Sequence, residues 1–456
     1  MVSEWKENTL GSISEIIMGQ SPKGDSCNND QHGHPLLNGP TEFGGYHPYP
    51  TQYTIDPKKF SQQGDLLFCV RGSTTGRMNW ADQEYAIGRG LAAMRHKNGR
   101  EYQPFLRGII ECKLPELLAS ATGSTFPNVS RNQLLDLEIE LPPLPEQKAI
   151  AHVLGALDDR IELNRRMNET LESMAQALFK SWFGDFDPVL DNALASGKEI
   201  PAELSDRAAA RAALGDKRQP LPAEIRTLFP DEFTDSAELG WIPEGWEVKT
   251  VSDFVEKLSK GTTARKVDIS NAKDEPEVPF LKVKDIDDKG IIKTEKLELI
   301  PRSVHEGPLK RSVLKEGDIL FSIAGTIGRT AVVPAELHDS NSNQAIAFVR
   351  SKEKSKTYFL LQLLRSENIQ HRVHSRIVQA VQANVSLTEL GNLPVIYACE
   401  GIINYLNEHL TGIYHKKFHL HSSSERLIKL RDTLLPKLLS GEIRIPEAEK
   451  MVAEVA

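Results

Sequence analysis

Residues 64–77 have the sequence GDLLFCVRGSTTGR, and residues 317–329 repeat it as GDILFSIAGTIGR. In both segments a short apolar run precedes a loop that contains two glycines and ends in an arginine. Such a run followed by a glycine-rich loop predicts a buried strand and a turn. Because the copies differ in length by only one inserted residue, they indicate that the chain carries one fold twice.

The repeat continues on both sides of this segment. The other matching pairs, in chain order, are EWKENTLGSISEI from Glu4 with GWEVKTVSDFVEK from Gly245, GLAAMR ending at Arg95 with AIAFVR ending at Arg350, and NVS at 128–130 with NVS at 384–386. Since these pairs keep their order, we expect two similar globular domains, at residues 1–143 and 241–398. Their strand-like runs alternate with helix-like segments such as Phe105 to Leu118, which predicts a mixed α/β or α+β fold.

A long helix with a heptad pattern is expected after each globular domain, at residues 144–185 and 399–445. The apolar seam positions are Leu154, Leu157, Ile161, Leu171 and Leu178 in the first helix and Leu406, Leu410, Leu427 and Leu434 in the second. Two seams of similar length most simply pair with each other as a coiled coil. Asn164 and Asn168 interrupt the first seam, where they either fix the register of the pair or turn toward solvent.

The remaining segments are predicted to be a connector and a tail. Residues 186–240 hold five prolines around an alanine-rich helical piece, which is typical of a connector. Residues 446–456 are expected to form a flexible tail. The expected order is therefore globular domain, helix, connector, globular domain, helix and tail.

Composition favours a cytoplasmic protein with no membrane association. The chain has 456 residues, 39% of them hydrophobic, and its longest apolar runs are too short to cross a membrane. Its four cysteines form no CxxC pair, so we expect reduced thiols and no zinc site. The formal net charge of −8 is concentrated in the connector, which leaves room for a local basic face elsewhere.

Motifs for catalysis are absent from the sequence. It contains no GxxxxGK[ST] phosphate loop, no GxSxG elbow, no HExxH pair and no NPPY or DPPY methyltransferase motif. We therefore predict that the chain catalyses nothing and that its two similar domains recognise the two parts of a split target.

Three strings resemble a known family, the specificity subunits of type I restriction-modification enzymes. The first is LPPLPEQKAIAHVLGALDDRIELNRRMNETLESMAQALFKSWF from Leu141 to Phe183, the second is LGWIPEGWEV from Leu239, and the third is LRDTLLPKLLSGEI from Leu430 to Ile443. The resemblance covers the full length and implies two target recognition domains joined by two long antiparallel helices. It also implies that each domain reads one half of an asymmetric bipartite DNA sequence.

The same resemblance implies partners and the place of the cofactors. The chain is expected to bind double-stranded DNA, two methyltransferase subunits, and one or two motor endonuclease subunits. Adenine methylation with S-adenosylmethionine, and DNA cleavage with ATP and magnesium, are expected on those partners as a defence against foreign DNA. This chain is expected to bind no cofactor and no metal.

Polar loops after the predicted strands supply the candidate DNA contacts, because arginine can read guanine, and asparagine or glutamine can read adenine. In the first domain the candidates are Asn38, Arg71, Ser73, Thr74, Thr75, Arg77 and Asn128. In the second they are Lys260, Thr262, Thr263, Arg265, Lys282, Lys284, Thr326, Arg329, Gln379, Gln382 and Asn384. The structural alternative is that the glycines only turn a hairpin and the arginines are solvated.

Two other classes of protein compete with this interpretation. A scaffold that binds only proteins would use the same helices to hold two protein-binding modules and would show no salt-dependent affinity for DNA. A nuclease would need acidic metal ligands, for which Asp285, Asp287 and Asp288 are candidates. Acidic residues beside a lysine and a glycine are more typical of a solvated turn.

Overall fold

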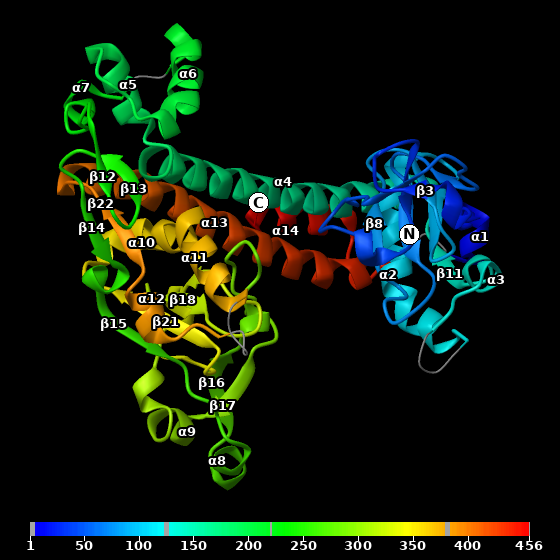
Figure 1. Cartoon of the computed structure of the whole chain (residues 1–456). Helices are drawn as coiled ribbons and strands as arrows, with labels where there is room; N and C mark the ends of the chain where they lie inside the picture. The colour runs from blue at the N-terminus through cyan, green and yellow to red at the C-terminus, as the bar shows by residue number, and fades with distance from the viewer. Residues whose placement is uncertain (1–4, 123–126, 219–220, 379–383, 456) are drawn as a thin grey trace. The chain divides into compact units, whose positions relative to one another are not determined.

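The computed structural model of the chain describes residues 5–122, 127–218, 221–378 and 384–455. It forms two compact units, one comprising residues 1–166 and 420–456 and the other residues 167–419. Each unit combines one copy of the repeat with parts of both long helices (Figure 1). Within the described residues, no helix combines the length and apolar character needed for a membrane crossing.

A four-stranded antiparallel sheet forms the centre of the first unit, with strand order β2-β10-β7-β8. Its strands are β2 (Ser14–Met18), β7 (Leu66–Cys69), β8 (Met78–Trp80) and β10 (Leu91–His96). Strand β7 is the apolar run of the repeat, and all four of its residues are buried because it lies between two neighbours. Phe105 and Leu106 of helix α2 (Gln103–Ala119) share one buried core with this sheet.

The other strands of the first unit form two further sheets. One contains β3 (Cys27–Asn28), β4 (His34–Leu37), β5 (Gln52–Thr54), β6 (Phe60–Ser61) and β9 (Tyr85–Ile87). Its order is β3-β5-β4-β9-β6, with β4 and β9 parallel. The other pairs β1 (Lys6–Thr9) with β11 (Glu138–Leu141) and so brings both ends of this domain together.

The second unit repeats this plan. Its four-stranded sheet has the order β15-β21-β18-β19, with β15 (Val255–Lys260), β18 (Ile319–Ser322), β19 (Thr330–Val332) and β21 (Ile346–Ser351). The remaining paired strands are β12 (Phe233–Ser236), β13 (Gly240–Pro243), β14 (Glu247–Thr250), β16 (Pro276–Leu281), β17 (Glu298–Pro301), β20 (Asn341–Ser342) and β22 (Pro394–Tyr397). Matching strand orders confirm that the chain carries a mixed α/β fold twice.

One buried ion pair recurs in both sheets. Asp65 accepts hydrogen bonds from Arg95 at 3.0 and 2.8 Å, and Asp318 accepts two from Arg350 at 2.7 Å. Both carboxylates also accept a backbone N–H from the turn that precedes their strand. Each pair therefore joins the start of the glycine-loop segment to the neighbouring strand, which explains why the two copies share these residue types.

Two helices of 40 residues, α4 (Leu144–Phe183) and α13 (Glu400–Leu439), pack together in each unit (Figure 1). In the first unit Leu154 and Leu157 share a buried cluster with Leu427 and Leu434. In the second unit the last turns of α4 share a cluster with Leu406 and other residues of the first turns of α13. The start of each helix thus meets the end of the other, which confirms the antiparallel helix pair.

The seam is less uniform than the heptad pattern predicts. Ile161, Leu171 and Leu178 are half-buried, whereas Asn164 is buried and donates to Ser423 of α13 at 3.4 Å. Asn168 is half-buried, with its side-chain oxygen enclosed and unpartnered. Of the two readings for Asn164, the structure therefore supports contact with the partner helix.

The connector does not stand apart from the domains. Phe186, Val189 and Phe229 join the buried core of the second unit, together with Trp182 and Trp246. Helices α5 (Asp187–Ser196), α6 (Ser205–Leu214) and α7 (Ala223–Arg226) lie along the segment. Apolar side chains between its prolines thus pack into the second unit.

The expected flexible tail is wrong for most of its length. Residues Ile445–Val455 form helix α14, in which Ala448 is buried, and Met451, Val452 and Val455 pack against the first core. Pro446 lies in the first turn, where a missing N–H costs no hydrogen bond. The apolar face of this short helix accounts for its docking.

Candidate nucleic-acid interface

The glycine loop of the first unit connects β7 to β8. Gly72 and Gly76 have φ angles of 95° and 94°, which ordinary side chains rarely adopt. Thr75 donates its hydroxyl to the carbonyls of Gly72 and Pro127, both at 2.8 Å. The loop is therefore held to the segment before Asn128, and Thr75 supports it from within.

The second unit builds its glycine loop in the same way between β18 and β19. Gly325 and Gly328 have φ angles of 75° and 92°. Ser322 donates to the carbonyl of Thr326 at 2.6 Å, and the N–H of Arg329 donates to Ser322 at 2.8 Å. Ser322 thus supports this loop from within, as Thr75 does in the first unit.

Five segments that are distant in sequence meet at this end of the first sheet. Main-chain N–H groups of Gly19, Val70, Gly88 and Val129 donate to carbonyls of neighbouring segments. The acceptors are Leu91, Gly90, Leu37 and Val70, at distances between 2.8 and 2.9 Å. The residues after β2, β4 and β7 and before β10 therefore form one edge of the unit with the segment that contains Asn128.

The same bonds recur in the second unit. Gly261, Ile323, Asn343 and Val385 donate to the carbonyls of Ile346, Ala345, Leu281 and Ile323, at 2.8 to 3.0 Å. Asn384 bridges Ala324 as Asn128 bridges Arg71. We call these two corresponding regions recognition edge 1 and recognition edge 2. Recognition edge 1 comprises residues 19–23, 38–41, 70–77, 87–90 and 128. Recognition edge 2 comprises residues 260–265, 282–284, 323–329, 343–345 and 384.

Three of the seven candidate side chains of recognition edge 1 are exposed, and the other four are half-buried. Arg71 is exposed and donates through Nε to Oδ1 of Asn128 at 3.1 Å, so the two side chains lie side by side. Arg77 and Ser73 are exposed, and Thr74 is half-buried. Asn38 donates to Gln52 at 2.8 Å beside Gly88. This edge thus presents guanidinium and amide groups together.

Several candidate side chains of recognition edge 2 already have partners in the fold. Arg329 contacts Asp288 at 2.6 Å and donates to the carbonyl of Ile286 at 2.8 Å. Lys282 pairs with Glu298, and Arg265 pairs with Asp268 at 2.8 Å. All three cations are therefore paired with carboxylates of the same unit.

The other candidates in the second unit are placed in different ways. Thr262 accepts hydrogen bonds from Arg311 and Ser312, both at 3.2 Å, and Thr263 donates to Gln344. Thr263 is exposed, as are Lys260, Lys284, Thr326 and Asn384. Gln379 and Gln382 lie outside the described residues.

Sequence reasoning missed one position in each edge. Arg89 and Gln344 occupy corresponding places in the turns before β10 and β21, and both side chains are exposed. The N–H of Arg89 donates to Ser21 at 3.2 Å. The sequence could have predicted this pair of positions, because the aligned GLAAMR and AIAFVR segments begin directly after them.

The acidic residues considered for a nuclease build a turn instead. Asp285 accepts the N–H of Lys282 at 2.8 Å, and Asp287 accepts those of Lys289 and Ile291. Asp288 pairs with Arg329. Among the residues that the structure describes, no group of three or more His, Cys, Asp or Glu side chains is placed to hold a metal ion.

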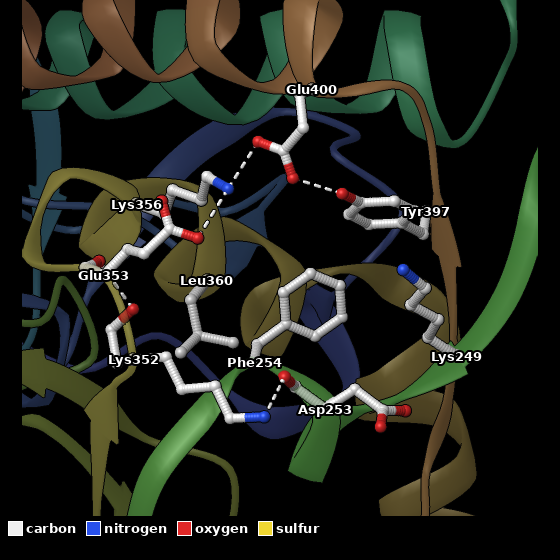
Figure 2. Close-up of a pocket in the computed structure, with 10 residues that line it drawn as sticks. Lys249, Asp253, Phe254, Lys352, Glu353, Lys356, Leu360, Tyr397 and Glu400 are labelled. Carbon is white, nitrogen blue, oxygen red and sulfur yellow. Dashed lines mark hydrogen bonds and ion pairs between the residues drawn. The ribbon is translucent and has the colours of Figure 1, made fainter.

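A pocket of about 310 Å³ lies at the opposite end of the second sheet, beside the first turn of α13 (Figure 2). Figure 2 shows Lys356 between Glu353 and Glu400, at 2.8 and 2.5 Å. Tyr397 donates to Glu400, and burial together with this carboxylate raises the pKa of Tyr397 to about 12. Lys356 is thus paired within the protein, and its contact with Glu400 connects the second globular domain to α13.

A repeated fold with two polar loop edges and a long helix pair defines a recognition protein with two similar binding modules. Residues 2–173 and 243–397 match the family described as type I restriction modification DNA specificity domain. The chain therefore belongs to this family, as a DNA-recognition subunit and not a catalytic one.

Individual relatives agree with this assignment. The chain is 26% identical to the type I restriction enzyme HindI specificity subunit of Haemophilus influenzae, over 97% of this chain and 100% of that protein. It is 37% identical to the putative type I restriction enzyme MjaX specificity subunit of Methanocaldococcus jannaschii, over 37% and 40% of the two chains. Its fold is similar to that of the type I restriction-modification S subunit from M. genitalium, with a TM-score of 0.55 and 15% identity, over 96% of each chain.

Proposed function

We propose that the chain reads an asymmetric bipartite DNA sequence, with one recognition edge for each half-site. The observation that carries this proposal is the duplicated edge, which keeps the same main-chain frame but presents different side chains in the two units. Similar frames would dock on DNA in similar ways, whereas different side chains would select different bases.

The proposed chemistry of recognition edge 1 centres on Arg71 and Asn128. Their side chains are 3.1 Å apart and offer a guanidinium fork beside an amide. In a major groove these groups can read guanine and adenine through paired hydrogen bonds. Arg77 and Lys23 would add contacts to phosphates, which position the edge without reading sequence.

The chemistry of modification and cleavage would come from partner subunits. We propose that two methyltransferase subunits join this chain and methylate adenine with S-adenosylmethionine. One or two motor endonuclease subunits would use ATP and magnesium to translocate and cut unmodified DNA. This chain would then supply the sequence specificity of the whole assembly.

The test is to coexpress the chain with the methyltransferase encoded beside its gene and to sequence the methylated adenines. We expect a motif with two defined parts and an unspecified gap. Replacing residues 1–143 by the corresponding domain of a relative should change one part of the motif and leave the other intact. Changes in both parts at once would contradict the assignment of one domain to each half-site.

The protein-only scaffold gives the opposite result in a simple binding experiment. The assembled complex should bind duplex DNA with an affinity that falls steeply as salt increases, because phosphate contacts release counterions. If the complex does not bind DNA, or if its affinity for DNA does not change with salt, the protein-only scaffold is favoured.

A further inference from the structure

In each unit a buried carboxylate of α4 contacts both the recognition fold and α13. In the second unit this carboxylate is Glu172, which is 9% exposed. It pairs with Nη1 of Arg365 at 2.6 Å, with Lys417 of α13, and with the hydroxyl of Tyr414 at 3.3 Å. Arg365 ends helix α10 (Thr357–Arg365) of the recognition fold. Three elements thus meet at one buried charge.

The first unit has a corresponding cluster around Asp158, which is 6% exposed. Its Oδ1 is 2.9 Å from Nη1 of Arg431 on α13, and its Oδ2 is 3.5 Å from Nη1 of Arg107 on α2. Although burial alone would lower the pKa of Arg431, its hydrogen bond to Asp158 keeps that pKa above the ordinary value. The guanidinium groups therefore stay charged.

Both arginines of the recognition folds also reach the strand that follows the glycine loop. Arg365 donates through Nε to the hydroxyl of Thr330 at 2.6 Å and through Nη2 to its carbonyl at 3.1 Å. Thr330 is the first residue of β19 and follows Arg329 directly. In the first unit the guanidinium of Arg107 lies 5.7 Å from the ring centroid of Trp80, the last residue of β8. Arg365 thus links α4 to the start of β19, directly after recognition edge 2, and Arg107 links α4 to the end of β8 that lies away from the glycine loop.

A second link of this kind exists in the second unit. Lys289 pairs with Glu169 of α4, three residues before Glu172. The adjacent Asp288 pairs with Arg329 of the glycine loop at 2.6 Å. The turn that holds both residues therefore connects α4 to recognition edge 2 without passing through Arg365.

Stability alone does not explain these clusters. Replacing a buried ion triad by apolar residues of similar size is often neutral or stabilising, because burying charges costs desolvation free energy. What the charges add is directionality, since a guanidinium fork and a carboxylate satisfy each other only in a narrow range of geometries. An apolar contact would allow the recognition fold to shift on the helices.

We propose that Arg107 and Arg365 are positioning residues for DNA reading, which hold each recognition edge at a fixed orientation on the helix pair. This inference rests on the proposed function. Loss of the cluster should leave the bases read by the edge unchanged, because neither arginine belongs to a recognition edge. It should instead widen the range of gap lengths that the assembly accepts.

The experiment uses the full chain coexpressed with its methyltransferase and a plasmid library in which only the gap between the half-sites varies. The single variant Arg365→Met leaves Glu172 paired with Lys417. The triple variant Glu172→Leu, Arg365→Met, Lys417→Met removes the whole charged cluster without leaving an unpaired ion. Arg302→Met is the matched control, because Arg302 lies in the same unit and its ion pairs with Glu277 and Asp339 are exposed.

In the wild type and the control, methylation should fall sharply when the gap changes by one base pair. In both cluster variants the ratio between the preferred gap and its neighbours should drop by about fivefold or more, with unchanged half-site sequences. The thermal midpoint of the triple variant should equal or exceed that of the wild type, which separates positioning from stability.

Two results would overturn the inference. One is a folded triple variant with the gap profile of the wild type. The other is a change of the half-site sequence at an unchanged gap, which would make Arg365 part of base reading. If the wild type shows no two-part motif, the proposed function fails instead, so the two failures can be told apart.

Discussion

Arg89 and Gln344 occupy corresponding turns in the two recognition edges, and both side chains are exposed. Arginine and glutamine can each make paired hydrogen bonds to one kind of base, worth about 1–3 kcal/mol of discrimination. We predict that Arg89→Ala relaxes one position of the half-site read by the first unit. Gln344→Ala should relax one position of the other half-site.

The measurement is the sequence of methylated sites in each variant. Lys113→Ala serves as the control, because Lys113 lies on α2, outside recognition edge 1, and pairs with the exposed Glu116. Relaxation of both half-sites by a single substitution would count against separate reading by the two edges.

The single residue Glu172 should make the stability of the protein depend on pH. Burial alone would raise the pKa of this carboxyl, but Arg365 and Lys417 lower it below its ordinary value of 4.5. A lowered pKa in the folded state stabilises the protein above the unfolded pKa, and this stabilisation is lost as the pH falls through the folded value. The charged cluster should therefore weaken in acid.

Glu172→Gln should lower the free energy of unfolding by about 3 kcal/mol at pH 7, since two buried cations lose their anion. The difference from the wild type should shrink as the pH falls below 4.5, the ordinary pKa of the carboxyl. Chemical denaturation at several pH values measures both effects, with the exposed Glu367→Gln as control. A difference that stays constant down to pH 3 would contradict the role assigned to the carboxylate.

At the scale of the element, α4 offers a direct comparison between its two faces. Leu157 is 1% exposed in the seam with α13, whereas Leu163 is 49% exposed. Leu157→Asp should cost about 3 kcal/mol or more, because it buries an unpaired charge. Leu163→Asp on the same helix should change stability by less than about 0.5 kcal/mol.

Thermal or chemical unfolding compares these two variants, and native mass measurement shows whether methyltransferase subunits remain bound. Leu157→Asp should also release those subunits, whereas Arg71→Ala should leave the assembly intact and weaken DNA binding. An intact assembly for Leu157→Asp would mean that the seam is assigned wrongly.

The elements also show which features can be predicted from sequence. The repeat, the buried strands β7 and β18 and the long helices were predictable, because each depends on a local pattern of apolar residues. Helix α14 was missed although Ile445, Ala448, Val452 and Val455 have helical spacing. That pattern covers only 11 residues, too short to predict a stable helix without the core it packs against.

Other features depend on contacts that no local pattern contains. The cluster around Glu172 joins α4, α10 and α13, and its members lie far apart in the sequence. The recognition edges likewise depend on strand order, which places residues after β2, β4 and β7 together. Pairing within the fold, as for Arg329 with Asp288, also cannot be read from residue type alone.

At the scale of the whole molecule, the helix pair should set the distance between half-sites. Adding seven residues to each helix preserves the heptad seam and lengthens each helix by about 10 Å. The insertions belong between Arg166 and Met167 and between His419 and Leu420, because both ion clusters then stay within their own units. The preferred gap should grow by about three base pairs, at about 3.4 Å per pair along each strand.

Some affinity should be lost with this insertion, because three extra base pairs rotate one half-site by about 100° unless the DNA untwists or bends. Methylation of the library with variable gaps measures the shift. A control with the same seven residues in only one helix should disrupt the seam and abolish methylation. A preferred gap that does not move would mean that the helices do not set the spacing.

Main-chain hydrogen bonds hold the recognition edges together, and this has a consequence for how new specificities can arise. Bonds such as those from Val70 to Gly90 and from Gly88 to Leu37 do not depend on the side chains they carry. Positions 73, 74, 77 and 89 should therefore accept many amino acids without loss of folding. A library randomised at these four codons, coexpressed with the methyltransferase and screened by sequencing the methylated adenines, should yield folded proteins with altered targets, so the same architecture that recognises one sequence is also suited to rapid diversification.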